Sequence, residues 1–347
     1  MPIIQWKTGT AFDFFVSLAV LHQPATFGLR PSWAAGVRQR LSSPNREMLE
    51  KFQSFSSIPL LWLSGLTEPN DASTALEAIS MMPEGERLTN LTLNAENNLD
   101  VSNCLRNIAG RGSWKDADLN VLKETYHLRD ATLNQESLIN LVTTWADAER
   151  SGELYLAALE EYYQVFFVEE ETRIRPALQA GLEHGKELAS QMSLEALIEE
   201  LSHGVRFSPL DNTLEFILAP SYWSSPLIFY ARLKPEKMLL LFGARPEFES
   251  IVPGTAPPPQ LVSALKALAD PTRLRILHFL AEQAISSSEL ARLLRLRLPT
   301  VIHHLRLLRL AGLVQITVGE TEKRYAARLE ILDGIQTALA NFIRSEK

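Results

Sequence analysis

Cysteine is nearly absent from this 347-residue chain, in which Cys104 is the single example. One cysteine forms no disulfide within the chain and supplies no cysteine-rich metal cluster, so we expect a reducing, cytoplasmic setting. Long apolar runs are absent too, since none reaches the roughly 18 residues that a membrane-spanning helix needs. Asp13 interrupts the start of the apolar stretch 14–21 and no clear cleavage site follows it, so we expect neither a signal peptide nor a membrane partner.

Catalytic and metal-binding motifs are also missing. The chain has no phosphate-binding loop, dinucleotide-binding fingerprint, nucleophile elbow or His-Glu-x-x-His helix. The spacing of His127, His184 and His203 matches no ligand pattern. We therefore expect no enzyme activity, no cofactor and no metal site.

Positive charge is scarce in most of the chain and concentrated at its end. From Pro258 onward the chain has 13 Lys and Arg and 8 Asp and Glu. The preceding residues have 21 Lys and Arg and 33 Asp and Glu. The sign changes at "VPGTAPPPQ", residues 252–260, whose prolines favour a stiff extended segment. This pattern predicts an acidic domain over 1–251, a linker over 252–260 and a basic domain over 261–347, with different partners for the two domains.

Helical periodicity dominates the acidic domain, and the sequence predicts a mainly α fold with small β elements. Three runs, "TLEFILA", "PLIFYARL" and "KMLLLFGA", predict a short antiparallel sheet at about 213–243. Residues 83–112 are rich in Asn and turn formers and carry no assignable pattern. The predicted helices cover 10–21, 32–41, 44–55, 116–129, 135–150, 154–191 and 194–202, with Pro176 breaking or kinking the longest.

The segment "PSYWSSP", residues 220–226, is the most site-like part of this domain. Tyr222 and Trp223 combine ring surface with polar tips beside small hydroxyls, which makes them candidate effector-binding residues. Packing in the core or the sheet is the alternative role for both rings.

Helix-capping and turn-forming residues divide the basic domain into short elements. Asp270 is placed to cap a helix that begins at Pro271, and Ser286 and Glu289 form a capping-box pattern. The predicted elements are a helix from Leu261, helices over 271–283, 287–294 and 299–312, hairpin strands over 314–318 and 323–327, and a closing helix over 329–344. This order is the layout of a winged helix-turn-helix.

The segments "ALKALADPTRLRILHFLAE", "SSELARLL", "PTVIHHLRLLRLAGLV" and "KRY" resemble the ArsR/SmtB-type bacterial repressors over nearly all of the basic domain. The resemblance implies a homodimer that binds double-stranded DNA, with each recognition helix in a major groove and the hairpin wing near the backbone or minor groove. The acidic domain is similar to the long N-terminal regions of larger regulators of this group, which carry "SYW"-type and "FGARP"-type segments. That similarity implies no defined activity.

Candidate DNA contacts follow from the helical spacing and from this resemblance. Val301, Leu305 and Leu308 form a core stripe on the recognition helix, so other positions are exposed. His304 points toward the packing side, apart from His303. The candidates are Thr300, His303 and Arg306 on the exposed face, Arg295 and Arg297 in the preceding turn, Lys323, Arg324 and Tyr325 on the wing, and Ser287 and Ser288 at an amide-rich helix start.

The chain departs from the family pattern beside these residues. Family members commonly show a polar pair ahead of the proline and a serine after the valine, where this chain has Arg297, Leu298 and Ile302. Ile302 is a candidate contact for a thymine methyl group, but it neither donates nor accepts a hydrogen bond.

The terminal helices of the basic domain suggest how two copies associate. Ile331, Ile335, Ala338 and Phe342 fall on one stripe of the closing helix, which favours a homodimer interface over packing within one copy. The metal sites known in this family are absent, because "SSSELARLL" has no cysteine and the last helix has Asp333 without a histidine.

The sequence thus predicts a homodimeric transcriptional repressor whose acidic domain responds to an unknown small-molecule effector. The alternative is an enzymatic or small-molecule-binding body whose winged helix serves as a protein-docking module, which exposed Ile302 and Leu298 suggest. A metal sensor is a third interpretation.

Overall fold

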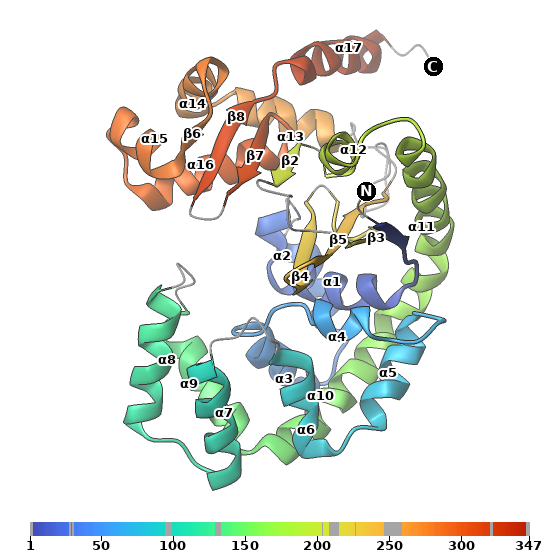
Figure 1. The fold of residues 1–347 in the computed structure, drawn as a ribbon, viewed down its shortest axis with the longest axis vertical. Coiled ribbons are helices and arrows are strands. Elements are labelled where there is room, and N and C mark those ends of the chain that lie inside the picture. Colours follow the sequence, from blue (N-terminus) through green and yellow to red (C-terminus); the bar gives the residue numbers. More distant parts are fainter. Residues whose placement is uncertain are drawn as a thin grey trace.

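The computed structural model describes residues 3–27, 29, 31–93, 99–128, 133–202, 204–207, 215–225, 227–245, 259–319 and 322–344. The chain forms a helical body and a C-terminal winged helix-turn-helix that lies against one end of it (Figure 1). The predicted class, mainly α with small β elements, is confirmed.

Helices make up most of the body. They are α1 (Ala11–His22), the short 3-10 helix η1 (Pro24–Phe27), α2 (Pro31–Arg38), α3 (Ser43–Gln53), α4 (Leu60–Ser64), α5 (Ala72–Ser80), α6 (Glu84–Thr92), α7 (Leu99–Arg111), α8 (Asp116–Leu128), α9 (Gln135–Ala146), α10 (Ala148–Tyr162), the π-helical segment η2 (Tyr163–Phe167), α11 (Val168–Ala189) and α12 (Leu194–Leu201). Two of them, α6 and α7, occupy most of 83–112, where the sequence shows no assignable pattern. Helix α11 continues through Pro176, so of the break or kink predicted there the break is wrong, and a π-helical turn, η2, precedes α11.

The body sheet is mixed, which corrects the antiparallel sheet predicted at about 213–243. Its strands are β1 (Ile3–Trp6), β3 (Glu215–Ser221), β4 (Phe229–Lys234) and β5 (Lys237–Gly243), in the spatial order β1-β3-β5-β4. Only β4 and β5 are antiparallel, whereas β1 and β5 both run parallel to β3. The central strands are buried on both faces, and this burial explains their continuous apolar runs.

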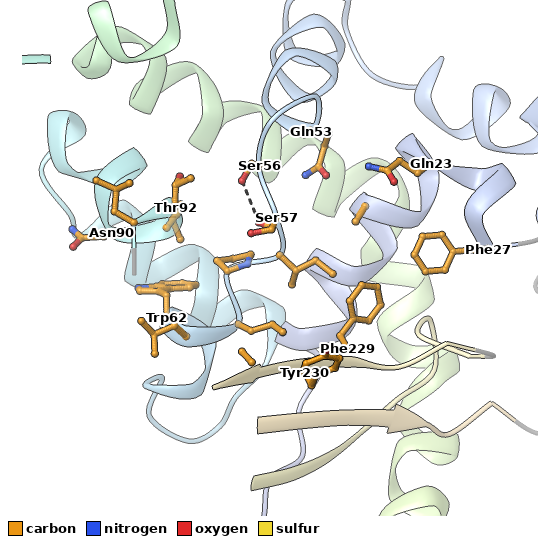
Figure 2. A pocket seen from close by; sticks show the side chains of 18 residues that line it. Gln23, Phe27, Gln53, Ser56, Ser57, Trp62, Asn90, Thr92, Phe229 and Tyr230 are labelled. Carbon is orange, nitrogen blue, oxygen red and sulfur yellow. Dashed lines mark hydrogen bonds between the residues drawn. The ribbon is translucent and has the colours of Figure 1, made fainter. Parts of the chain in front are cut away.

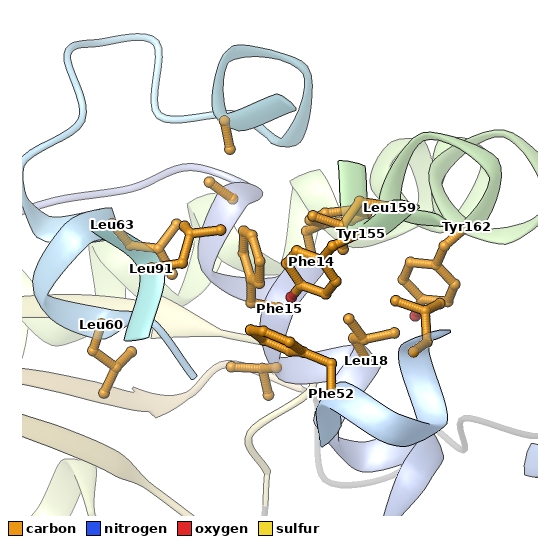
Figure 3. Packing of buried hydrophobic residues seen from close by; sticks show 14 of the residues in the cluster. Phe14, Phe15, Leu18, Phe52, Leu60, Leu63, Leu91, Tyr155, Leu159 and Tyr162 are labelled. Atoms are coloured by element: carbon orange, nitrogen blue, oxygen red, sulfur yellow. The ribbon is translucent and has the colours of Figure 1, made fainter. Parts of the chain in front are cut away.

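The main core lies where α1, α3, α10 and one face of this sheet meet. Phe14, Phe52 and Tyr155 are almost fully buried there, with the Phe52 and Tyr155 rings stacked at 4.0 Å between centroids (Figure 3). The other sheet face carries Phe216 and Leu240, which belong to a second cluster that also includes helix α12 and Ile316. Burial of these apolar surfaces fixes the body around the sheet.

The C-terminal elements agree closely with the predicted ones. They are α13 (Pro259–Leu268), α14 (Pro271–Glu282), β6 (Ile285–Ser286), α15 (Ser287–Leu294), α16 (Leu298–Leu310), β7 (Val314–Val318), β8 (Lys323–Ala327) and α17 (Glu330–Arg344). Strands β7 and β8 pair as the predicted hairpin. Helix α17 extends away from the rest of the molecule (Figure 1).

A strand of the body joins the sheet of the wing. Strand β2 (Val205–Phe207) runs parallel to β7, with Val205 opposite Ile316 and Phe207 opposite Val318. The Ile316 amide donates a hydrogen bond of 3.1 Å to the carbonyl oxygen of Gly204. The wing sheet therefore has the order β2-β7-β8-β6 and connects the two parts of the chain across the predicted linker. Residues 252–258 of that linker lie outside the described residues, and 259–260 begin α13.

Candidate nucleic-acid interface

Capping interactions set the geometry of the helix-turn-helix. The Asp270 side chain accepts a 2.9 Å hydrogen bond from the Arg273 amide, and this bond lowers the pKa of the Asp270 carboxyl. Ser286 and Glu289 form the predicted capping box at the start of α15. The Ser286 amide likewise holds the pKa of Glu289 below its ordinary value. Both helices therefore begin where the sequence predicts.

Arg295 makes the turn between α15 and α16. It adopts φ = 55°, the left-handed region that costs a residue with a side chain about 1 kcal/mol. In return the Leu296 amide donates to the carbonyl of Ala291, which closes the end of α15. This turn leaves Arg295 and Arg297 exposed immediately ahead of α16.

Helix α16 has a buried stripe and an exposed face. Val301, Leu305 and Leu308 are buried in the core of the winged helix, as predicted. Thr300, Ile302 and His303 are exposed, and 48% of the Ile302 surface is accessible. The exposed face therefore offers a hydroxyl, an imidazole and an aliphatic side chain to a binding partner.

The two histidines of α16 have different surroundings, as the sequence predicts. His303 is exposed, and its Nδ1 lies 3.5 Å from Nη2 of half-buried Arg306. His304 is half-buried, and desolvation lowers its pKa although Asp270 acts in the opposite direction. Arg306 and His303 thus form one polar group at the exposed face, while His304 belongs to the packing against α14.

On the wing, Lys323 and Arg324 are exposed, but Tyr325 faces inward. The Tyr325 ring packs against both the core of the winged helix and the cluster shared with the body, and burial raises its pKa. Strand alternation explains the correction, because Arg324 and Tyr325 point to opposite faces of β8. The predicted display of Tyr325 on the wing is therefore wrong.

Arg324 is tied to its surroundings. Its Nε lies 2.8 Å from the Glu322 carboxylate, its Nη1 donates to the carbonyl of Ala284, and Nη2 lies 3.8 Å from Glu289. These contacts hold the wing against the start of α15. Ser287 is half-buried and Ser288 exposed at that helix start, with the Ser288 hydroxyl 3.3 Å from that of Ser286.

The predicted effector residues do not form an open site. Tyr222 and Trp223 are 0% and 1% exposed, so both belong to the core, the alternative that the sequence left open. The Trp223 ring stacks on Trp33, while the Tyr222 hydroxyl accepts a 2.7 Å hydrogen bond from Arg173.

The segment that holds these two residues wraps around a buried carboxylate. Asp13 accepts hydrogen bonds from the Ser221 hydroxyl and the Trp223 amide, and its burial raises its pKa to about 6. The Ser221 hydroxyl and the Trp223 amide therefore bind Asp13, and both rings of the segment are buried.

Two features are absent from the part of the chain that the structure describes. No group of three or more His, Cys, Asp and Glu among those residues is arranged to hold a metal ion. None of the helices described there is both long and apolar enough to cross a lipid bilayer.

Two helices joined by a short turn, a two-stranded wing and an exposed basic turn define a winged helix-turn-helix, a class of DNA-binding fold. Residues 270–315 match the family model described as "Bacterial regulatory protein, arsR family". HlyU from Vibrio cholerae N16961 is a similar solved structure, with 30% identity over 25% of this chain and 94% of that one and a TM-score of 0.20. No curated protein matches the chain. Through its C-terminal winged helix, the chain belongs to the arsR family of DNA-binding regulators.

Sequence reasoning missed a cavity in the body. It holds about 420 Å³ and lies between α1, α4, the end of α6 and the edge strand β4 (Figure 2). Its wall is formed by several segments that are far apart in the sequence, from Ala19 to Ala231, so no local sequence motif predicts the cavity. Only the folded chain brings these segments together.

Proposed function

We propose that this protein is a cytoplasmic, homodimeric transcriptional repressor whose DNA occupancy is controlled by a small-molecule effector bound to the acidic body. The observation that carries the proposal is the exposed surface formed by the turn before α16 and by the exposed face of α16. It combines Arg295, Arg297, Thr300 and His303 on a domain with a net positive charge.

In this proposal the exposed residues have two kinds of role. Arg295, Arg297 and Lys323 contact phosphates and position the domain, with further phosphate contacts from Ser287, Ser288 and Arg324. Thr300, Ile302, His303 and Arg306 face base edges in the major groove. Tyr325 supports the wing from within and does not contact DNA.

The homodimer is proposed from α17. Ile331 and Ile335 pack partly against the core of the winged helix, whereas Phe342, further along, is 46% exposed. An exposed aromatic residue on an amphipathic helix that extends from the molecule favours pairing with the same helix of a second copy.

Footprinting of the full-length protein on fragments selected from genomic DNA tests this function. We expect two protected half-sites separated by roughly one helical turn or a multiple of it. Arg306→Ala is expected to weaken binding about tenfold, because a single side-chain contact to a base contributes roughly 1–3 kcal/mol. Arg106→Ala, an exposed arginine of α7, is the matched control and should leave binding unchanged.

A footprint that is absent even at low salt, or equal binding by the two arginine variants, would contradict the proposal. If a pull-down then retained a protein after nuclease treatment, the winged helix would be a protein-docking module instead. Leu298, 42% exposed beside Ile302, is the observation that favours that second function.

A further inference from the structure

The cavity in the body has the size and chemistry of a small-molecule site. Its volume of about 420 Å³ falls in the range of cavities that enclose small ligands. Rings from three segments contribute to its wall, namely Phe27, Trp62 and Phe229 (Figure 2). Phe27 and Phe229 stack on one another, with 5.9 Å between centroids, so part of the apolar wall is preorganised.

The polar groups of the cavity are neutral. The described residues that line it include the amides of Gln23, Gln53 and Asn90 and the hydroxyls of Ser56 and Ser57, and none of those lining residues is Asp, Glu, Lys, Arg or His. A charged ligand would lose its hydration here without gaining a counter-charge, which is costly. Amides and hydroxyls instead match uncharged donors and acceptors.

The edge strand β4 connects this cavity to the wing. Phe229, Tyr230 and Ala231 of β4 all border the cavity. Alternate side chains of a strand point to opposite faces, so Phe229 and Ala231 pack toward the main core while the Tyr230 ring is more exposed. The Tyr230 ring meets Phe207 of β2 edge to face, with 5.0 Å between centroids. Phe207 in turn is paired with Val318 of β7.

The path from β4 thus leads through two ring and strand contacts to the wing. A shift of β4 acts on β2 through the Tyr230 ring, and on β7 through the pairing of Phe207 with Val318.

We propose that the cavity binds an uncharged, ring-containing small molecule and that its occupancy is transmitted to the wing through Tyr230 and Phe207. The proposal rests on the effector-controlled regulator proposed above and specifies its effector site. Coupling requires that the ligand bind two arrangements of β4 with different affinity.

Fluorescence titration with N-phenyl-1-naphthylamine, an uncharged aromatic probe, tests the binding step on the full-length protein. Anilinonaphthalene sulfonate, which adds one negative charge to the same ring system, is the comparison probe. We expect saturable binding of the neutral probe and about tenfold weaker binding of the sulfonate, because the described lining residues offer no counter-charge.

Gln53→Glu places a charge in the wall with almost no change in shape, and we expect it to weaken the neutral probe about tenfold. Gln135→Glu, an exposed position at the start of α9, is the matched control and should bind like the unmodified protein. Gln23→Glu, on an exposed residue of the lining, gives a second test if Gln53→Glu does not fold. Equal affinity in all of these proteins, or a preference for the sulfonate, would overturn the proposed site.

Hydrogen exchange measures the coupling step without DNA. Probe binding is expected to change the exchange of 204–207 and 314–318, the segments that pair β2 with β7. Phe207→Leu should keep probe affinity within about twofold and lose this change, since the residue lies outside the cavity wall. Unchanged exchange in the unmodified protein, or an unchanged response in Phe207→Leu, would overturn the coupling. Since no DNA is present, a failure here is distinguishable from a failure of operator binding.

Discussion

Ile302 stands where the family resemblance implies a serine, and its side chain is half exposed on the face of α16 that we propose for DNA. An aliphatic side chain discriminates through contact with a thymine methyl group, whereas a hydroxyl discriminates through hydrogen bonds. Isoleucine in place of serine is therefore expected to alter which base is preferred at one position of the operator, without altering phosphate contacts.

Ile302→Ser is expected to change base preference at a single operator position by about 1 kcal/mol while the salt dependence of binding stays the same. Binding competition among operators mutated one position at a time measures this effect. An unchanged preference profile would show that Ile302 does not contact a base.

His22 gives the body a defined response to acid. Its Nδ1 lies 2.8 Å from the carbonyl oxygen of Leu18, and burial lowers its pKa from 6.5 to about 4. A depressed pKa means that the unfolded chain takes up a proton at a pH where the folded chain does not. The contribution of neutral His22 to the stability of the folded protein is therefore complete above pH 6.5, and it is lost as the pH falls from 6.5 toward 4.

We expect the stability difference between the unmodified protein and His22→Gln to shrink by about 2 kcal/mol over this interval. Urea unfolding at several pH values measures the difference. His278→Gln, which removes a strongly exposed histidine of α14, is the control for the substitution itself. Parallel pH curves for His22→Gln and the unmodified protein would contradict the account.

Among the elements, α6 and α10 meet at an unusually close contact. A Cβ atom added to Gly152 of α10 would lie 2.1 Å from the carbonyl oxygen of Glu84 in α6. Gly152→Ala is therefore expected to destabilise the protein by about 2–3 kcal/mol. Gly85→Ala, one residue from the same contact, meets no atom within 4 Å and should stabilise α6 by about 0.5 kcal/mol. Thermal unfolding of the two variants compares them directly, and equal midpoints would refute the close contact.

Elements with local signals were predictable from the sequence, and those fixed by distant partners were not. Asp270, Ser286 and Glu289 act within three residues of themselves, so the helices of the winged helix were placed almost to the residue. Strand β1 is only four residues long, and its pairing with β3 joins positions more than 200 residues apart. The direction of β3 and β5 likewise depends on burial of both sheet faces, which their apolar runs do not reveal alone.

The candidate site divides in the same way. Exposure of Thr300, Ile302 and His303 follows from helical period, and the structure agrees with it. Tyr325 was misplaced because its burial depends on the contact between wing and body. Tyr222 and Trp223 are buried rather than open to an effector, because the Trp223 amide donates a hydrogen bond to buried Asp13, some 200 residues earlier.

At the scale of the whole molecule, the body, the wing and α17 have separate tasks in the proposed regulator. Strand β2 of the body pairs with β7 of the wing, so a movement in the body can reach the wing through this sheet. Helix α17 extends from the molecule and is proposed to pair with a second copy. Phe342→Asp is expected to shift the protein from dimer to monomer, since a carboxylate is costly in an apolar interface. Sedimentation velocity measures the shift, and a dimer that persists at micromolar concentration would place the interface elsewhere.

The salt dependence of operator binding by the full-length protein tests the central claim most directly. Neutralised phosphates release counterions, so a DNA-binding surface of this kind gives a logarithm of affinity that falls linearly with the logarithm of salt concentration. We predict such a line, with a slope smaller in magnitude by about 1 in Arg297→Ala, whose side chain is exposed ahead of α16. An affinity that does not change with salt, or an identical slope in the variant, would contradict the assignment of this surface to DNA.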